Sequence, residues 1–135
     1  MLYEYADPIS SINMHCADEG QEMGWHFDNS EFAINLLPQA PQSGGQFEYI
    51  QDLDNAETGE MNFPGVAALL DGDAAVEQLM VAPRTLVLFR RRNSIHRVTP
   101  TIYARTRILV VIAYNAKPSI VLSEAARTTF FGRLG

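Results

Sequence analysis

The chain of 135 residues, 47% hydrophobic and 19% charged, is long enough for one domain with one core and too short for two ordinary catalytic domains. Its net charge of −6 would repel phosphate backbones, so we expect no nucleic-acid partner. No apolar run approaches the roughly 20 residues that span a bilayer, so we expect no membrane partner either. Cys16 is the single cysteine, which excludes an intramolecular disulfide, and with no signal-peptide pattern after Met1 it indicates a soluble, cytoplasmic protein.

The N-terminal part of the chain predicts short strands separated by turns. Segments rich in β-branched and aromatic residues are typical of strands. Pro8 separates the first two, because proline cannot serve the middle of a ladder, and Pro38 is expected to end the fourth. Gly44 and Gly45 permit a tight turn. The predicted strands cover residues 2–6, 12–17, 23–27, 32–37 and 45–50.

The C-terminal part adds two central strands and the helices. Residues 85–89 and 108–114 are β-branched apolar runs typical of buried strands, whereas residues 51–62 are acidic and polar and predict a surface loop. Many short strands favour a closed or sandwiched antiparallel architecture, so the expected fold class is mainly β. Helices are predicted at residues 64–70, at 73–80, where 76–81 also fits a strand, and at 122–131, with Ser123 as N-cap.

Three residues of types that bind metal ions follow the order His-x-Asp and, far along the chain, a second His. His26 and Asp28 occupy positions i and i+2 at the end of a predicted strand, so both side chains point to one face. His96 lies far along the chain and reaches the same face if the sheet closes on itself. Two imidazoles and one carboxylate leave three positions of an octahedral Fe(II) open, as an oxygenase requires. Trp25 and Phe27 point to the opposite face and are expected in the core.

The sequence around these residues strengthens the interpretation. The distinctive stretches are residues 24–32 (GWHFDNSEF), 44–49 (GGQFEY), 86–89 (LVLF) and 93–100 (NSIHRVTP). In content and order they resemble the iron(II)- and 2-oxoglutarate-dependent oxygenases of the prolyl-hydroxylase-like kind, particularly the bacterial branch of small-molecule and amino-acid hydroxylases and halogenases. The resemblance implies a double-stranded β-helix, or jelly-roll, core with a short helical insert and a C-terminal helix. It would form a single Fe(II)/2-oxoglutarate dioxygenase domain over residues 1–135.

The resemblance also implies roles for particular residues. It assigns the Fe(II) ligands to His26, Asp28 and His96, and the arginine that holds the far carboxylate of 2-oxoglutarate to Arg105. Arg107 lies two residues further along the same predicted strand and would share its face, so it is the alternative anchor. Arg105 is preferred because its distance from His96 is commoner in the family. The implied reactants are O₂ and a small-molecule substrate, with an amino-acid-like molecule as one option.

Further polar residues are candidates for the pocket. Asn35 interrupts an apolar strand and either faces the cosubstrate or substrate or is hydrogen bonded by a neighbouring strand. Asn13 and His15 lie on the strand before the motif and would line the substrate pocket, unless His15 is an ordinary half-buried histidine. The arginines at 90–92 and Arg127 either attract a substrate carboxylate or are solvated surface.

Asp28 bears on the reaction type. The halogenases that resemble this stretch have a small residue in place of the aspartate, which leaves a coordination position for chloride. Because the carboxylate is present, hydroxylation or a related C–H oxidation such as desaturation is favoured. One rival is a non-catalytic barrel with a vestigial metal site that acts in binding or assembly. Another is a cupin-like metalloenzyme, but the cluster of two histidines and a glutamate that cupins usually offer does not follow His26.

The resemblance raises one question about assembly. Members of this branch usually carry N-terminal helices before the segment that resembles residues 2–17, whereas this sequence starts almost directly in the barrel. A minimal enzyme, a fragment, and a domain whose sheet is completed by a partner are the three explanations. Since an uncovered sheet face would be a large apolar patch, a homodimer through it is one expectation.

Overall fold

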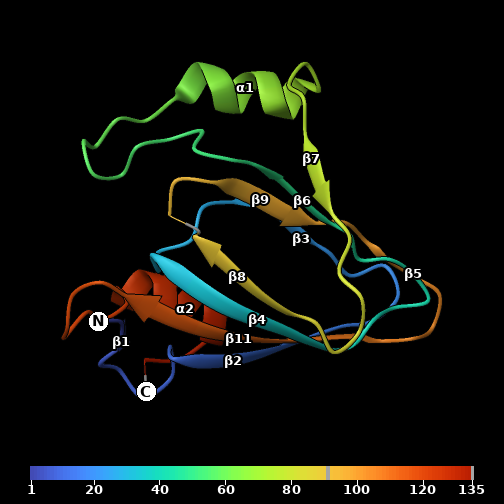
Figure 1. The fold of residues 1–135 in the computed structure, drawn as a ribbon, viewed down its shortest axis with the longest axis horizontal. Helices are drawn as coiled ribbons and strands as arrows, with labels where there is room; N and C mark the ends of the chain where they lie inside the picture. The colour runs from blue at the N-terminus through green and yellow to red at the C-terminus, as the bar shows by residue number, and fades with distance from the viewer. Residues whose placement is uncertain (91, 135) are drawn as a thin grey trace.

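Short strands joined by turns make up most of the protein in its computed structural model, which describes residues 1–90 and 92–134 (Figure 1). Antiparallel pairing joins these strands into two main sheets and a two-stranded one, and two helices complete the described part. The main sheets lie one above the other in Figure 1. The predicted mainly β class is confirmed, and the layers fit a jelly-roll core. Neither helix of the described residues is long and apolar enough to cross a membrane.

The larger sheet is built around its longest strand, β11 (Arg107–Asn115). One edge of β11 pairs antiparallel with β4 (Phe32–Gln39), to which β8 (Leu86–Arg90) is added. The other edge of β11 pairs with β2 (Ile12–Ala17) and β1 (Tyr3–Glu4). The predicted strand at residues 108–114 is therefore central, as its run of β-branched residues indicates. The strand predicted at residues 85–89 is β8, and its expected central position is wrong, because β8 pairs only with β4 and lies at the edge of the described sheet.

The smaller sheet brings together segments that are remote in sequence. Its order is β3, β9, β6 and β7, all antiparallel. A two-stranded sheet, formed by β5 and β10, closes the turn that contains Gly44. The bounds are β3 Met23–His26, β5 Ser43–Gly44, β6 Phe47–Ile50, β7 Glu77–Leu79, β9 Ile95–Val98 and β10 Thr101–Ile102.

Both helices begin at a side-chain cap. The amide oxygen of Asn62 accepts a hydrogen bond of 3.0 Å from the backbone N–H of Gly65 at the start of α1 (Phe63–Asp71). The hydroxyl of Ser123 accepts one of 3.1 Å from Ala126 at the start of α2 (Glu124–Phe131). These bonds satisfy N–H groups that the first helical turn leaves unpaired. The predicted helical insert, C-terminal helix and Ser123 cap are confirmed.

Three local predictions are wrong. The strand expected at residues 2–6 is only Tyr3–Glu4. The helix expected at 73–80 does not form; the alternative, a strand within 76–81, is confirmed by β7, which pairs with β6. Pro38 does not end β4, which continues to Gln39. The register of β4 against β11 shifts by one residue at this point, and such a bulge accommodates a proline because the ladder is already interrupted there.

The expected burial of Trp25 and Phe27 is also wrong, because both remain half-buried. The guanidinium of Arg97 lies 4.8 Å from the centre of the Trp25 ring and covers it in a cation–π contact. The aromatic surface next to the metal-ligating residues is thus shielded by a charged side chain and not by a packed core.

A buried carboxylate, Asp7, ties the two ends of the chain together. It accepts hydrogen bonds from the hydroxyl of Ser10 and from the backbone N–H groups of Ile9 and, at 3.1 Å, Leu122. Burial alone would raise the pKa of Asp7. These hydrogen bonds and the charge of Arg127 outweigh it and hold the pKa below its ordinary value of 3.8.

We predict that Asp7→Asn lowers the free energy of unfolding at neutral pH by about 1–3 kcal/mol, because the amide cannot accept all of these hydrogen bonds. Since the folded pKa of Asp7 is depressed, its ionic contribution is complete above 3.8 and is lost as the pH falls through the lower folded value. Urea unfolding of wild type and variant across this range measures the difference. Asp71→Asn, an exposed site, is the control and should change little; equal stability of wild type and Asp7→Asn at neutral pH would contradict the proposed tie.

Candidate metal centre

The pairing of β3 with β9 brings two histidines next to each other. His26 and His96 are direct cross-strand partners, and their ring centres lie 4.2 Å apart. Asp28 follows His26 by two residues, just beyond the end of β3. The carboxylate oxygens of Asp28 lie 3.7 Å from Nε2 of His26 and 3.3 Å from Nε2 of His96. The sequence order His-x-Asp and distant His thus becomes one cluster in space.

The cluster is closed on one side and open on the other. Its three ligand atoms all lie within 4.8 Å of one another. The side chain of His96 is only 1% exposed, whereas those of Asp28 and His26 are 17% and 19% exposed. An ion held here would be bound by the buried His96 on its inner side and would keep open coordination positions on the side of the cluster that is exposed.

Backbone carbonyl groups orient both imidazoles. Nδ1 of His26 lies 2.7 Å from the carbonyl oxygen of Gly24, and Nδ1 of His96 lies 3.0 Å from that of Ser94. Because a carbonyl only accepts, each Nδ1 donates its proton, and in a neutral imidazole the lone pair is then on Nε2, the ring nitrogen that lies near Asp28. This donor set fits a divalent metal ion, and two histidines with one carboxylate are typical of non-heme Fe(II).

Aromatic side chains pack around the buried histidine. The ring of Phe47 stacks on His96 at a centre distance of 5.3 Å, and Phe89 meets it edge-on at 5.4 Å. Neither residue stood out as part of the site in the sequence, although the predicted strands at 45–50 and 85–89 contain them. Their alternation with polar or outward residues is the signal that could have indicated an inner face.

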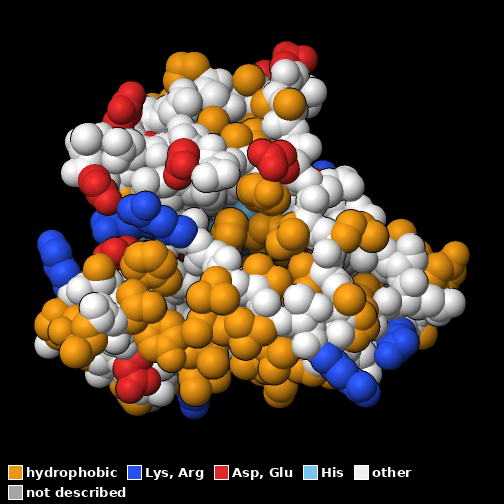
Figure 2. All heavy atoms as spheres, viewed as in Figure 1, with side chains coloured by type: hydrophobic (Ala, Val, Ile, Leu, Met, Phe, Trp, Pro, Cys, Tyr) orange, Lys and Arg blue, Asp and Glu red, His pale blue; other side chains and the backbone are white. Residues whose placement is uncertain are grey.

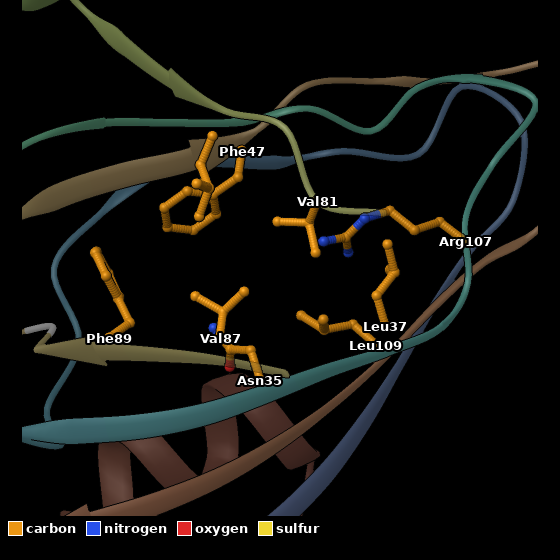
Figure 3. A pocket seen from close by; sticks show the side chains of 9 residues that line it. Asn35, Leu37, Phe47, Val81, Val87, Phe89, Arg107 and Leu109 are labelled. Carbon is orange, nitrogen blue, oxygen red and sulfur yellow. The ribbon is translucent and has the colours of Figure 1, made fainter. Parts of the chain in front are cut away.

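Arg107 lies within a cavity between the two sheets. Its side chain points among apolar residues in Figure 3 and is only 7% exposed. Burial lowers the pKa of its guanidinium, and no carboxylate of the described residues lies within 4.0 Å of it. Burying a cation among apolar side chains costs folding free energy unless an anion pairs with it. The cavity is lined by Asn35, Leu37, Phe47, Leu79, Val81, Val87, Phe89, Arg107 and Leu109.

Arg105 does not share this position. It is exposed in the turn between β10 and β11, two residues before the strand begins at Arg107. The expectation that both arginines lie on one strand with a common face is therefore wrong. Only Arg107 faces the interior.

Glycine at position 45 leaves the space that Arg107 occupies. A Cβ added to Gly45 would lie 2.8 Å from Cδ of Arg107 and 2.9 Å from Cγ of Pro41, and the φ of Gly45 is +60°. Gly44 also has a positive φ, of +68°. The predicted tight turn thus has a second role, which is to admit the arginine side chain.

Asn35 lines the same cavity as this arginine, from the inner face of β4. It is buried, and its Oδ1 finds no hydrogen-bond partner among the described residues. The alternative of an amide oxygen satisfied by a neighbouring strand is therefore not what the structure has. An unpaired buried acceptor costs about 1–3 kcal/mol, so a donor from a bound molecule or water is expected at this point.

A second cavity opens on the exposed side of the metal cluster. Asn13 and His15 line it together with His26 and Asp28. The C-terminal helix supplies part of its wall through Phe130 and Phe131, which the sequence did not associate with the site. The remaining lining residues are Tyr5, Ser10, Met23, Asn29, Ser30, Val111, Ala113 and Leu122.

Two of the other arginines considered for the substrate have partners elsewhere, and Arg92 is exposed. Arg90 lies 3.4 Å from Glu57, and both are exposed. Arg127 donates a hydrogen bond of 2.7 Å to the carbonyl oxygen of Leu134. Arg91, part of the expected basic stretch, lies outside the described residues.

Comparison with known proteins supports the same interpretation. The sequence model of the halogenase D family matches residues 4–129, which is nearly the whole chain. The chain belongs to the halogenase D family. None of the curated proteins matches it. Membership of this family and the His26, Asp28 and His96 cluster together fit a non-heme iron oxygenase.

We predict that Asp28→Ala weakens Fe(II) binding by more than roughly 100-fold, because the carboxylate is the only anionic group of the cluster. Loss of a residue that only hydrogen bonds a metal ligand already costs roughly 10–100-fold. Anaerobic titration of the protein with Fe(II) measures the affinity. Asp73→Ala, which removes an exposed carboxylate beyond α1, is the control and should bind Fe(II) as wild type does. Unchanged affinity in Asp28→Ala would mean that iron binds elsewhere.

Proposed function

We propose that the protein is an Fe(II)- and 2-oxoglutarate-dependent oxygenase that hydroxylates, or otherwise oxidises at a C–H bond, a small molecule. The observation that carries the proposal is a buried arginine that shares a cavity with one histidine of the metal cluster. This cavity, of about 490 Å³, is lined by His96, Arg107 and Asn35 together. This volume lies within the usual range of small-molecule sites.

The cosubstrate suits the two ends of this cavity. A dicarboxylic keto acid has one end that can chelate a metal and a second carboxylate at the other end. The guanidinium of Arg107 would pair with that second carboxylate, which removes the cost of the buried cation. The unpaired Oδ1 of Asn35 then faces a bound water or a protonated group beside the cosubstrate.

The protein's own residues do three kinds of work in this proposal. His26, His96 and Asp28 would hold the iron, and the carbonyl groups of Gly24 and Ser94 keep the two rings in position. The apolar side chains around Arg107 exclude water, which strengthens its attraction for a carboxylate. Bound iron would supply the activation of O₂ while 2-oxoglutarate is converted to succinate and CO₂.

The substrate would approach from the open side of the cluster. The cavity between the cluster and α2 offers hydrogen-bonding groups at Asn13 and His15 and an apolar wall at Phe130 and Phe131. A small molecule with a polar end and an aliphatic portion suits these surroundings, and an amino-acid-like molecule is one such compound.

Halogenation is the second candidate, and the family match favours it. The position of Asp28 supports hydroxylation instead. The Asp28 carboxylate, 3.3 Å from Nε2 of His96, would serve as the third ligand of the iron, where the halogenases that resemble this stretch have a small residue and leave room for chloride. With that position taken, oxygen transfer to the substrate is the outcome that the ligand set supports.

We expect the purified protein with Fe(II) and O₂ to convert 2-oxoglutarate to succinate. Without the substrate this conversion should still occur, but slowly. Mass spectrometry or an enzymatic succinate assay measures the conversion, and 2-oxoglutarate added anaerobically should give a weak visible charge-transfer band. Replacing chloride by sulfate in the buffer should leave the rate unchanged; a requirement for chloride would favour halogenation. Absence of both succinate and the band would favour the vestigial metal site.

We predict that Arg107→Ala raises the KM for 2-oxoglutarate by more than about a hundredfold, since removal of one partner of a buried ion pair typically costs about 3–5 kcal/mol. Arg105→Ala should change this KM by less than about threefold, because Arg105 is exposed. Initial rates at varied 2-oxoglutarate measure both, and Fe(II) affinity without cosubstrate should survive both changes. The sequence spacing alone favoured the opposite order, so a larger effect at Arg105 would restore that first expectation.

A second pair of variants tests the same anchor without removing it. Gly45→Ala should also raise the KM for 2-oxoglutarate, because the added Cβ displaces Arg107. Gly20→Ala is the matched control, since Gly20 has a comparable φ of +79° but open space around its Cβ. Equal kinetic effects of the two variants would mean that backbone strain, and not the position of Arg107, is responsible.

A further inference from the structure

The larger sheet carries a continuous apolar surface on the side away from the metal cluster. In an antiparallel sheet, directly paired residues point to the same side. The registers of β2, β11, β4 and β8 therefore define two rows of four apolar side chains across the sheet. The first row is Met14, Val110, Leu36 and Leu86, and the second row is Ile12, Ile112, Ile34 and Leu88.

These eight residues, here called the outer face, point away from the interior. Their neighbours along β2 and β8, namely Asn13, His15, Val87 and Phe89, line the inner cavities. Strand alternation then turns the residues between them outward. Figure 2 shows hydrophobic side chains gathered over the region where Figure 1 draws β4, β8 and β11.

The outer face is unusually exposed for apolar residues. Five of its members are exposed by 37–76%: Leu36 37%, Leu86 54%, Ile12 64%, Met14 69% and Leu88 76%. These five alone leave roughly 600 Å² of apolar side chain in water, which is the upper end of the largest patches on typical monomers. With the half-buried members added, the area approaches the roughly 800 Å² that each partner contributes to a stable interface.

We propose that a second copy of this chain covers the outer face, so that two molecules associate through their larger sheets. The area fits a standard dimer interface, and none of the eight residues is charged. In an interface with twofold symmetry a surface meets itself, so a charged face would meet like charges, whereas an apolar face is complementary to itself.

The net charge of the chain supports this choice of contact surface. Two copies that each carry a charge of −6 repel one another, and a stable contact must bury surface free of acidic groups. The larger sheets of two molecules would pack face to face as the two sheets of a β-sandwich do, at a spacing of about 10 Å and an angle near −30°. The proposal does not rest on the proposed function, because it is argued from the exposure and charge of the outer face alone.

Sedimentation velocity from about 1 to 100 μM tests the dimer directly. We expect wild type to sediment as a dimer whose dissociation gives a Kd in or below this range, and Leu88→Glu to weaken association by more than about a hundredfold, because it buries unpaired like charges. Leu70→Glu is the matched control, since Leu70 is a leucine of similar exposure (65%) on α1. It should associate as wild type does.

Several results would overturn the proposal. They are a wild-type monomer at every concentration, open-ended larger assemblies in place of a closed pair, and a dimer that Leu88→Glu leaves intact. Circular dichroism establishes that each variant is folded. Met14→Glu, on a different strand of the outer face, gives the same readout should Leu88→Glu not fold.

Cys16 provides a test that needs no substitution. This single cysteine is exposed and pairs with Ile108, one row beyond Met14 and Val110 on the same side of the sheet. Its alkylation by iodoacetamide, measured per chain, should slow several-fold as the protein concentration rises through the range in which dimers form. A rate independent of protein concentration, with dimers present, would assign the interface to another surface.

Discussion

The cross-strand pairing of His26 with His96 is the constraint on which the whole candidate site depends. It sets the distance between the two rings, and each ring then donates to the carbonyl oxygen of the residue two positions earlier in the chain. A shift of register by one residue would turn one ring to the other face of the sheet. The position of Asp28 follows from the same pairing, because it lies two residues beyond His26.

That pairing is in turn secured by the strand on the other edge of β9. Tyr49 of β6 is the direct partner of His96, and Glu48 is the partner of Arg97, with which it also forms an ion pair at 2.6 Å. Glu48 is buried, and Gln78 of β7 donates a further hydrogen bond of 2.8 Å to it. His96 is thus held in β9 by backbone pairing with β3 on one edge and β6 on the other. The side chains of Arg97, Glu48 and Gln78 add a polar network beside it.

Much of the site could be predicted from local rules, and the rest depended on tertiary structure. The period of two along a strand was enough to put His26 and Asp28 on one face, and the capping chemistry of Ser123 was enough to start α2. The start of β11 could not be predicted in this way. The turn before it includes Tyr103 with a φ of +70°, and no glycine, proline or asparagine marks it, so Arg105 seemed to belong to the strand.

Pro38 and β7 illustrate the other limit. A proline within an apolar run normally indicates the end of a strand, but the bulge that admits Pro38 arises only when β4 meets β11. The segment before Val81 has no strong preference of its own and becomes extended because β6 offers an edge. In both cases the deciding interaction is with a strand remote in sequence.

The connection between β6 and β7 has a consequence for how this protein can evolve. The two strands are adjacent and antiparallel, yet the chain between them makes a long excursion that includes α1, above the smaller sheet in Figure 1. Its first part is held by hydrogen bonds from Asp54 and Ala56 to Asn93. Beyond these contacts the ends of the excursion are fixed by the ladder, so a change in its length costs mainly the entropy of loop closure, about 0.6 kcal/mol for each doubling. The excursion is therefore a natural point for domain insertion and for divergence among paralogues, since it can grow or shrink while the histidine pair stays in register.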